Sequence, residues 1–120
     1  LKGDIVKKTD TGGMFTVEDL AAEALRFENG EIVYTGPIYG FKMKPAADTA
    51  GEIEASLLAQ YGLCAEDFRP LRAPGSRRPA ILRPDDLEIG ESPEGLRFAF
   101  TLPSGAYATT VMREFIQKPM

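Results

Sequence analysis

Glycine and proline interrupt this chain at short intervals, and this is the feature that most restricts how it can fold. Turn signals stand at residues 10–13, 29–30, 36–37, 62 and 75–76, where glycine and proline favour a reversal over a continued helix or strand. The segments between them alternate between strand-like and helix-like patterns and show no internal repeat. The sequence therefore predicts an α+β fold, in a single compact domain with a mixed or antiparallel sheet and two to three helices.

The predicted strands are short. They are residues 5–6, 14–17, 31–35, 77–84, 85–89 and 96–102. The first two flank the turn at 10–13 and are expected to pair as a hairpin, and the third is expected to end at 36–37. Prolines in 77–84 favour the edge of a sheet, because proline cannot donate a ladder hydrogen bond. Apolar side chains at every second position of 96–102 predict a strand with one apolar face.

Two helices are predicted in the first half of the chain. Residues 18–25 are good helix formers, and the turn at 29–30 should end that helix. Residues 49–61 form the second, since Thr49 and Glu52 have the spacing of a capping box. Apolar residues recur on one side of this second helix, which predicts a face that packs against the rest of the protein.

The closing stretch, LPSGAYATTVMREFIQKP, predicts a third helix. Ser104 is a suitable N-cap, and Pro119 is expected to end the helix. Tyr107, Val111 and Phe115 lie on one face, which is expected to pack on the sheet.

Composition excludes several kinds of site. The chain has no histidine, so Ser-His and Cys-His catalytic pairs and His-bearing zinc sites cannot be built from it alone. Its one cysteine, Cys64, is expected to be a small buried side chain. A formal net charge of −4 argues against a strongly basic nucleic-acid module. No apolar run approaches the roughly 20 residues of a membrane span, so we expect a cytoplasmic protein that makes no membrane contact.

Four blocks of sequence carry a resemblance to one known family. They are GDIVKKTDTGGMFTVEDLAAE, EIVYTGPIYGFKM, APGSRRP and FTLPSGAYATTVMREFI. On these blocks the chain resembles the insertion domain, or TRUD domain, of the tRNA pseudouridine synthase D family, together with the motif that follows it. The resemblance implies that residues 1–120 form this insertion domain and that residues 102–120 return towards a catalytic domain.

The same resemblance implies an activity for the parent protein, namely isomerisation of a uridine in tRNA to pseudouridine, at position 13 in typical members, without metal or organic cofactor. The family's catalytic aspartate lies in a Gly-x-Lys-Asp context on the amino-terminal side of the insertion. None of the aspartates here has that context; Asp4 follows Gly3, and Asp10 follows Thr9. We therefore expect no catalytic residue and no activity in this chain alone, with tRNA and the parent catalytic domain as its partners.

Basic residues are the candidate RNA contacts. They are Lys7, Lys8, Lys42, Lys44, Arg72, Arg77, Arg78 and Arg83. In APGSRRP a Gly-Ser turn between prolines presents Arg77 and Arg78, which suits bidentate phosphate binding; the alternative is a solvated surface turn. For Tyr34, Tyr39 and Phe41 core packing is favoured, with stacking on an unpaired base as the alternative.

Two functions stay open from the sequence. The favoured one is a part of an RNA-modifying isomerase, in which this domain holds tRNA against the catalytic domain. In that case the surface that faces the catalytic domain could make the isolated domain self-associate. The alternative is a self-standing small protein-interaction domain without catalytic activity.

Overall fold

Two compact units make up the protein. The structure is a computed structural model that describes residues 1–117, apart from the side chain of Asp85. The first unit is Leu1–Ile81 and the second begins at Leu82. Within the described residues, three helices and exclusively antiparallel strand pairs confirm the predicted α+β class. Where one compact domain was expected there are two units, because the last two strands pair only with each other.

A four-stranded antiparallel sheet organises the first unit, in the order β2-β1-β3-β4. Its strands are β1 (Ile5–Lys8), β2 (Met14–Thr16), β3 (Ile32–Ile38) and β4 (Ser76–Pro79). The predicted hairpin of β1 and β2 and the edge position of β4 are both confirmed. The expected end of β3 at Gly36-Pro37 is wrong. Pro37 pairs with Arg77 of β4 and lies beyond the part of β3 that pairs with β1. Proline has no N–H to donate, but no hydrogen bond to β1 is lost at this position.

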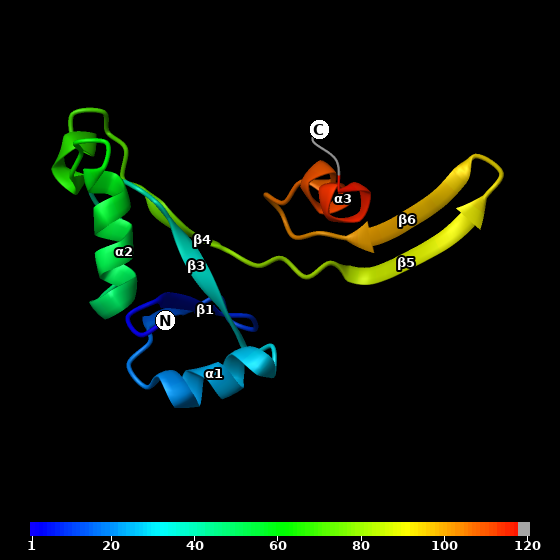
Figure 1. Cartoon of the computed structure of the whole chain (residues 1–120), viewed down its shortest axis with the longest axis horizontal. Helices are drawn as coiled ribbons and strands as arrows, with labels where there is room; N and C mark the ends of the chain where they lie inside the picture. The colour runs from blue at the N-terminus through cyan, green and yellow to red at the C-terminus, as the bar shows by residue number, and fades with distance from the viewer. Residues whose placement is uncertain (118–120) are drawn as a thin grey trace. The chain divides into compact units, whose positions relative to one another are not determined.

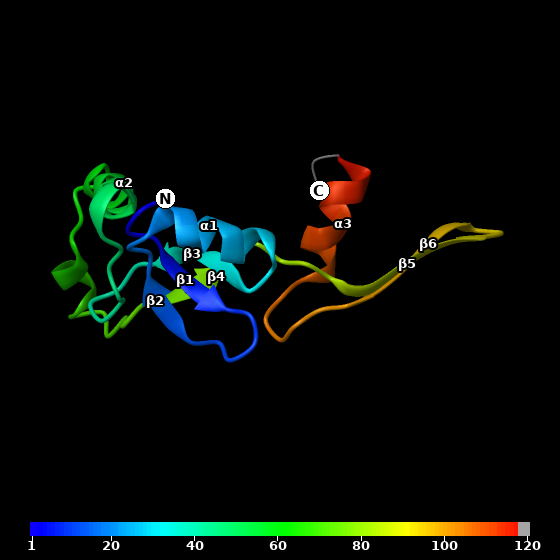
Figure 2. The ribbon, with the colours of Figure 1, turned by 90° about the horizontal axis from the view of Figure 1, so that it is seen from below.

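Helix α1 (Leu20–Glu28) covers one face of this sheet (Figure 2). The Asp19 side chain accepts a hydrogen bond from the Ala22 N–H and so caps the first turn. Beneath the helix lies the core of the first unit. Its buried members are Val6, Val17 and Ile32, with Phe15 and Phe27 packed against them.

Helix α2 (Asp48–Ala59) begins earlier than predicted and has no capping box. The N–H groups of Ala47 and Ala50 donate instead to the carbonyls of Gly3 and Lys2, so backbone from a distant segment satisfies the first turn. The predicted packing of its apolar face is wrong for most of its residues. Ile53, Leu57 and Tyr61 are exposed, whereas Leu58 is half-buried and Ala50 is buried.

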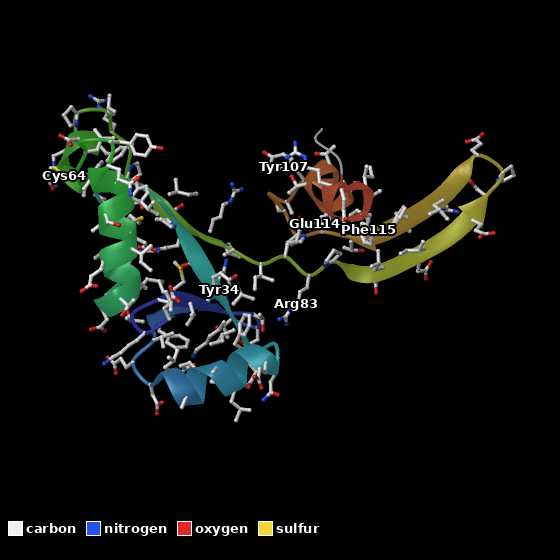
Figure 3. All side chains as sticks on the ribbon, in the orientation of Figure 1. Tyr34, Cys64, Arg83, Tyr107, Glu114 and Phe115 are labelled. Carbon is white, nitrogen blue, oxygen red and sulfur yellow. The ribbon has the colours of Figure 1, made fainter. Side chains whose placement is uncertain are left out.

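The turn after α2 places Cys64 at the surface. Cys64 is exposed, which contradicts the expected buried position (Figure 3). A short 3₁₀ helix, Ala65–Phe68, follows it, and the Asp67 carboxylate accepts a hydrogen bond from the Cys64 N–H. The residue therefore starts a capped surface turn instead of filling the core.

In the second unit, the described residues form a two-stranded antiparallel sheet and one helix, which Figure 1 labels as β5, β6 and α3. Strands β5 (Asp85–Ser92) and β6 (Gly95–Thr101) form the hairpin, and α3 (Ala108–Ile116) contacts it through an aromatic pair. The rings of Phe98 and Phe115 lie 4.8 Å apart between centroids. Tyr107 is the N-cap residue, so the prediction of Ser104 is wrong: the Ala106 N–H donates to the Pro103 carbonyl and forms a turn first. Pro119 lies outside the described residues.

Candidate nucleic-acid interface

Two loops of the first unit bring basic residues together around one aromatic ring. The N–H groups of Phe41 and Lys42 donate to the carbonyls of Ala73 and Pro74, at 3.1 and 2.8 Å. The loop after β3 therefore lies beside the loop that contains Arg72. We call Phe41, Lys42, Arg69 and Arg72 the Phe41 cluster.

Two cations of the Phe41 cluster lie over the ring or near it. Lys42 Nζ is 5.7 Å from the ring centroid of Phe41, and Arg69 Cζ is 4.8 Å from it. Arg72 is exposed. A ring flanked by solvent-accessible cations can contact both the bases and the phosphates of a single strand.

Glu66 moderates the charge of this cluster. Arg69 donates two hydrogen bonds to the Glu66 carboxylate, at 2.8 and 3.2 Å. These hydrogen bonds, and then the attraction of the opposite charges, hold the pKa of Glu66 below its usual range and raise the pKa of Arg69. Lys42 and Arg72 have no ion pair among residues 1–117, so they carry the uncompensated charge.

Arg77 is buried, with 1% of its side chain exposed. Its Nη1 donates to Glu54 Oε1 and its Nη2 to Glu54 Oε2, the second at 2.7 Å. Nε and Nη2 also donate to the Lys44 carbonyl at 2.9 and 2.8 Å. The guanidinium thus joins β4 to α2 and fixes the loop that contains Lys44. Its predicted RNA contact stays a prediction, while the structure gives it a positioning role.

Arg78 follows Arg77 in β4 and differs from it in environment. It is exposed, and adjacent strand residues point to opposite faces of a sheet. It pairs through the backbone with Gly36 of β3. No ion pair holds its side chain among the described residues, so Arg78 is the arginine of APGSRRP that is accessible to a phosphate.

The remaining basic candidates do not form one site. Lys7 and Lys8 are neighbours in β1 and belong to opposite faces; Lys7 is half-buried and Lys8 is exposed. Lys44 is exposed, and its carbonyl is held by Arg77. Arg83 belongs to the second unit, in the segment between β4 and β5 (Figure 3).

The three aromatic candidates have different environments. The Tyr34 ring packs against Phe27, with centroids 5.9 Å apart. The Tyr39 hydroxyl donates to the Glu54 carbonyl at 2.8 Å. Of the three, Phe41 is the ring that two cations approach.

Tyr39 should make stability depend on pH at the alkaline end. Burial, and then the negative charge of Glu54, raise the pKa of Tyr39, partly opposed by Arg77. A raised pKa in the folded state favours the protonated form, so this contribution is present below about pH 10 and is lost above it. Urea titrations at pH 8 and pH 11 should show a smaller alkaline loss for Tyr39→Phe than for the wild type. An equal loss in both proteins would contradict this.

Metal sites and membrane spans are two other kinds of feature that a chain of this size can carry. Residues 1–117 contain no group of three or more His, Cys, Asp or Glu side chains placed to hold a metal ion. None of the helices in this range combines the length and the apolar character that crossing a membrane requires.

Comparison with known proteins identifies the family. The family model for tRNA pseudouridine synthase D (TruD) matches residues 1–115. A tRNA pseudouridine synthase D of Anaeromyxobacter dehalogenans is 48% identical over 118 residues, which cover 95% of this chain and 33% of the relative. Its counterpart in Thermus thermophilus is 45% identical over 115 residues, covering 96% of this chain and 32% of the relative.

A solved structure agrees in fold. The crystal structure from Methanosarcina mazei that carries the name tRNA pseudouridine synthase D aligns with a TM-score of 0.77 and 28% identity. It covers 98% of this chain, which matches 31% of the solved one. The chain thus spans about a third of the length of the curated relatives it matches. Since the family model matches nearly all of the sequence, this chain belongs to the tRNA pseudouridine synthase D family.

Proposed function

We propose that this chain is the insertion domain of a tRNA pseudouridine synthase and that it helps to bind and position tRNA. Uridine isomerisation needs a carboxylate held beside an extruded base. No aspartate of this chain follows a lysine, as the family's catalytic context requires. The catalytic aspartate therefore belongs to another part of the parent protein, and this segment supplies contacts and not chemistry.

The Phe41 cluster is the observation that carries this proposal. It combines an aromatic ring with the cations of Lys42 and Arg69, and the exposed Arg72 belongs to the neighbouring loop. Cations neutralise phosphates, and an aromatic face can accept an unpaired base. These groups lie in a chain whose net charge is −4, so a local concentration of cations provides the attraction to RNA that the whole domain lacks.

Residues 102–120 are proposed to lead towards the catalytic domain. The hairpin of β5 and β6 is a two-stranded sheet, and such sheets are marginally stable without further packing. Its residues Ile89 and Leu96 are exposed. These features support a second unit that is completed by another part of the parent chain.

One observation favours the alternative, a small protein-interaction domain. In α2, Ile53 and Leu57 are each 46% exposed, and Tyr61, just after the helix, is 80% exposed. Exposed apolar residues that lie close together are typical of a protein contact. RNA binding separates the two functions, because a protein-interaction domain with this net charge has no reason to bind tRNA.

The experiment is a titration of the 120-residue chain with unmodified tRNA at low and at moderate salt. We expect measurable binding at low salt, and weaker binding by the variant Lys42→Ala/Arg72→Ala. Each lost phosphate contact should also lower the salt slope by about 1. Arg78→Ala tests the exposed arginine of β4 separately. Arg77 is left intact, because its ion pair with Glu54 supports the fold.

Lys2→Ala is the matched control, since Lys2 is an exposed lysine of the same unit outside the Phe41 cluster. Its affinity should equal that of the wild type. Absence of binding at low salt, or equal losses in Lys2→Ala and Lys42→Ala/Arg72→Ala, would count against RNA binding by this domain.

A further inference from the structure

A hollow lined by an aromatic ring and by cations lies between the β1–β2 hairpin and α1. It has a volume of about 330 Å³, within the size range of small-molecule sites. The residues that line it are Lys8, Gly13, Met14, Phe15, Glu23 and Arg26. The hairpin contributes the first four and α1 the last two, so the packing of the helix on the sheet creates the hollow.

The Phe15 ring is the fixed part of this hollow. It is half-buried and packs against the core of Val6, Val17 and Ile32. Arg26 Cζ lies 5.2 Å from the ring centroid, and Lys8 Nζ lies 6.0 Å from it. Two cations from different elements therefore approach one ring whose position the core determines.

Glu23 orients one of these cations. Its carboxylate oxygens both accept from Arg26 Nη1, at 3.0 and 3.4 Å. The structure records no protein acceptor for the other N–H groups of Arg26 among residues 1–117. The guanidinium is thus held by one nitrogen and keeps donors for a ligand. With Lys8, Arg26 and Glu23 all charged, the hollow has one positive charge in excess.

We propose that this hollow binds one nucleotide of single-stranded RNA. The inference rests on the proposed RNA-binding function and adds a contact separate from the Phe41 cluster. The base stacks on the Arg26 guanidinium and the Phe15 ring, as planar cations and rings do with unpaired bases. Lys8 binds the phosphate, whose single negative charge matches the excess positive charge. A free anion would contact the cations but not the ring, and a free apolar ligand would contact the ring but not the cations.

The test is a titration of the 120-residue chain with a ten-nucleotide oligouridylate at low salt. Amide NMR and affinity measurements monitor the binding. The amide signals of Gly13, Met14 and Phe15 should shift on titration. Phe15→Leu, which keeps an apolar side chain against the core, should weaken binding by about 10-fold through lost stacking.

A fold defect in Phe15→Leu would also weaken binding, so Lys8→Gln and Arg26→Gln provide a second test of the hollow. Each of these two substitutions removes a charge at its edge. Each should weaken binding several-fold, and Lys8→Gln should lower the salt slope by about 1. Lys2→Gln removes a lysine outside the hollow and should bind like the wild type.

The outcomes separate this inference from the proposed function. In one outcome RNA binds, but the amide shifts fall around Phe41 alone and the hollow variants bind like Lys2→Gln. The hollow is then not a nucleotide site, while RNA binding by the domain stands. If neither the oligouridylate nor tRNA binds at low salt, the proposed function fails and this inference fails with it.

Discussion

Replacing Arg77 with alanine is expected to lower the free energy of unfolding by about 3–5 kcal/mol, the usual cost of removing one partner of a buried ion pair. The Glu54 carboxylate, 14% exposed, would lose its cation. The Lys44 carbonyl would lose two hydrogen bonds as well. Because Arg77 connects β4, α2 and the Lys44 loop, the loss should be seen in the whole first unit.

Urea denaturation of Arg77→Ala and Arg78→Ala provides the comparison, since the two arginines are neighbours in β4. Arg78→Ala should change stability by less than about 0.5 kcal/mol, as exposed substitutions do. Replacing both charged partners, as Arg77→Met with Glu54→Leu, should recover part of the loss, because no unpaired buried charge remains. Equal effects of Arg77→Ala and Arg78→Ala would show that the buried pair contributes nothing measurable.

Gly75→Ala should have an effect of similar size for a steric reason. Gly75 has φ +76°, and a Cβ there would lie 2.5 Å from the Ile38 carbonyl oxygen and 2.6 Å from the Gly40 nitrogen. The positive φ alone costs about 1–2 kcal/mol for a residue with a side chain. Because the obstructing atoms are backbone, the loop that precedes β4 and the chain at the end of β3 must move apart, and we expect a total loss of about 4 kcal/mol or more.

Gly62→Ala separates the cost of the positive φ from the cost of the steric clash. Gly62 has φ +70°, and a Cβ at this position would meet nothing within 4 Å. It should therefore show only the conformational cost of about 1–2 kcal/mol. Thermal unfolding of both variants measures the difference, and a Gly75→Ala variant no less stable than Gly62→Ala would disprove the close approach of the two loops.

Local signals predicted the elements of this fold well. Turn residues located the β1–β2 hairpin, and the proline content of the 77–84 segment predicted an edge strand; both depend on the backbone chemistry of a few adjacent residues. The start of α2 was missed because backbone carbonyls of Lys2 and Gly3 take the place of a side-chain cap. The sequence around Thr49 contains no sign of that distant contact.

The candidate interface was predicted only in part, for the same reason. Lys42 and Arg72 stand far apart in the sequence, whereas backbone hydrogen bonds place their two loops side by side. Arg77 appeared equivalent to Arg78, because its partner Glu54 lies 23 residues away in the chain. The sequence around Arg26 contains no sign of its contact with Phe15, since that contact depends on how α1 packs on the sheet.

The short strand β4 protects one edge of the four-stranded sheet against aggregation. An open strand edge offers unpaired N–H and carbonyl groups to another molecule, and natural proteins blunt such edges with proline, charge and brevity. β4 has all three, with four residues that include Arg78 and Pro79. The β5–β6 hairpin has longer strands, and within the described residues neither has a further partner. In a concentrated solution of this chain, intermolecular strand addition should therefore begin at the hairpin, and the β4 edge of the four-stranded sheet should resist it.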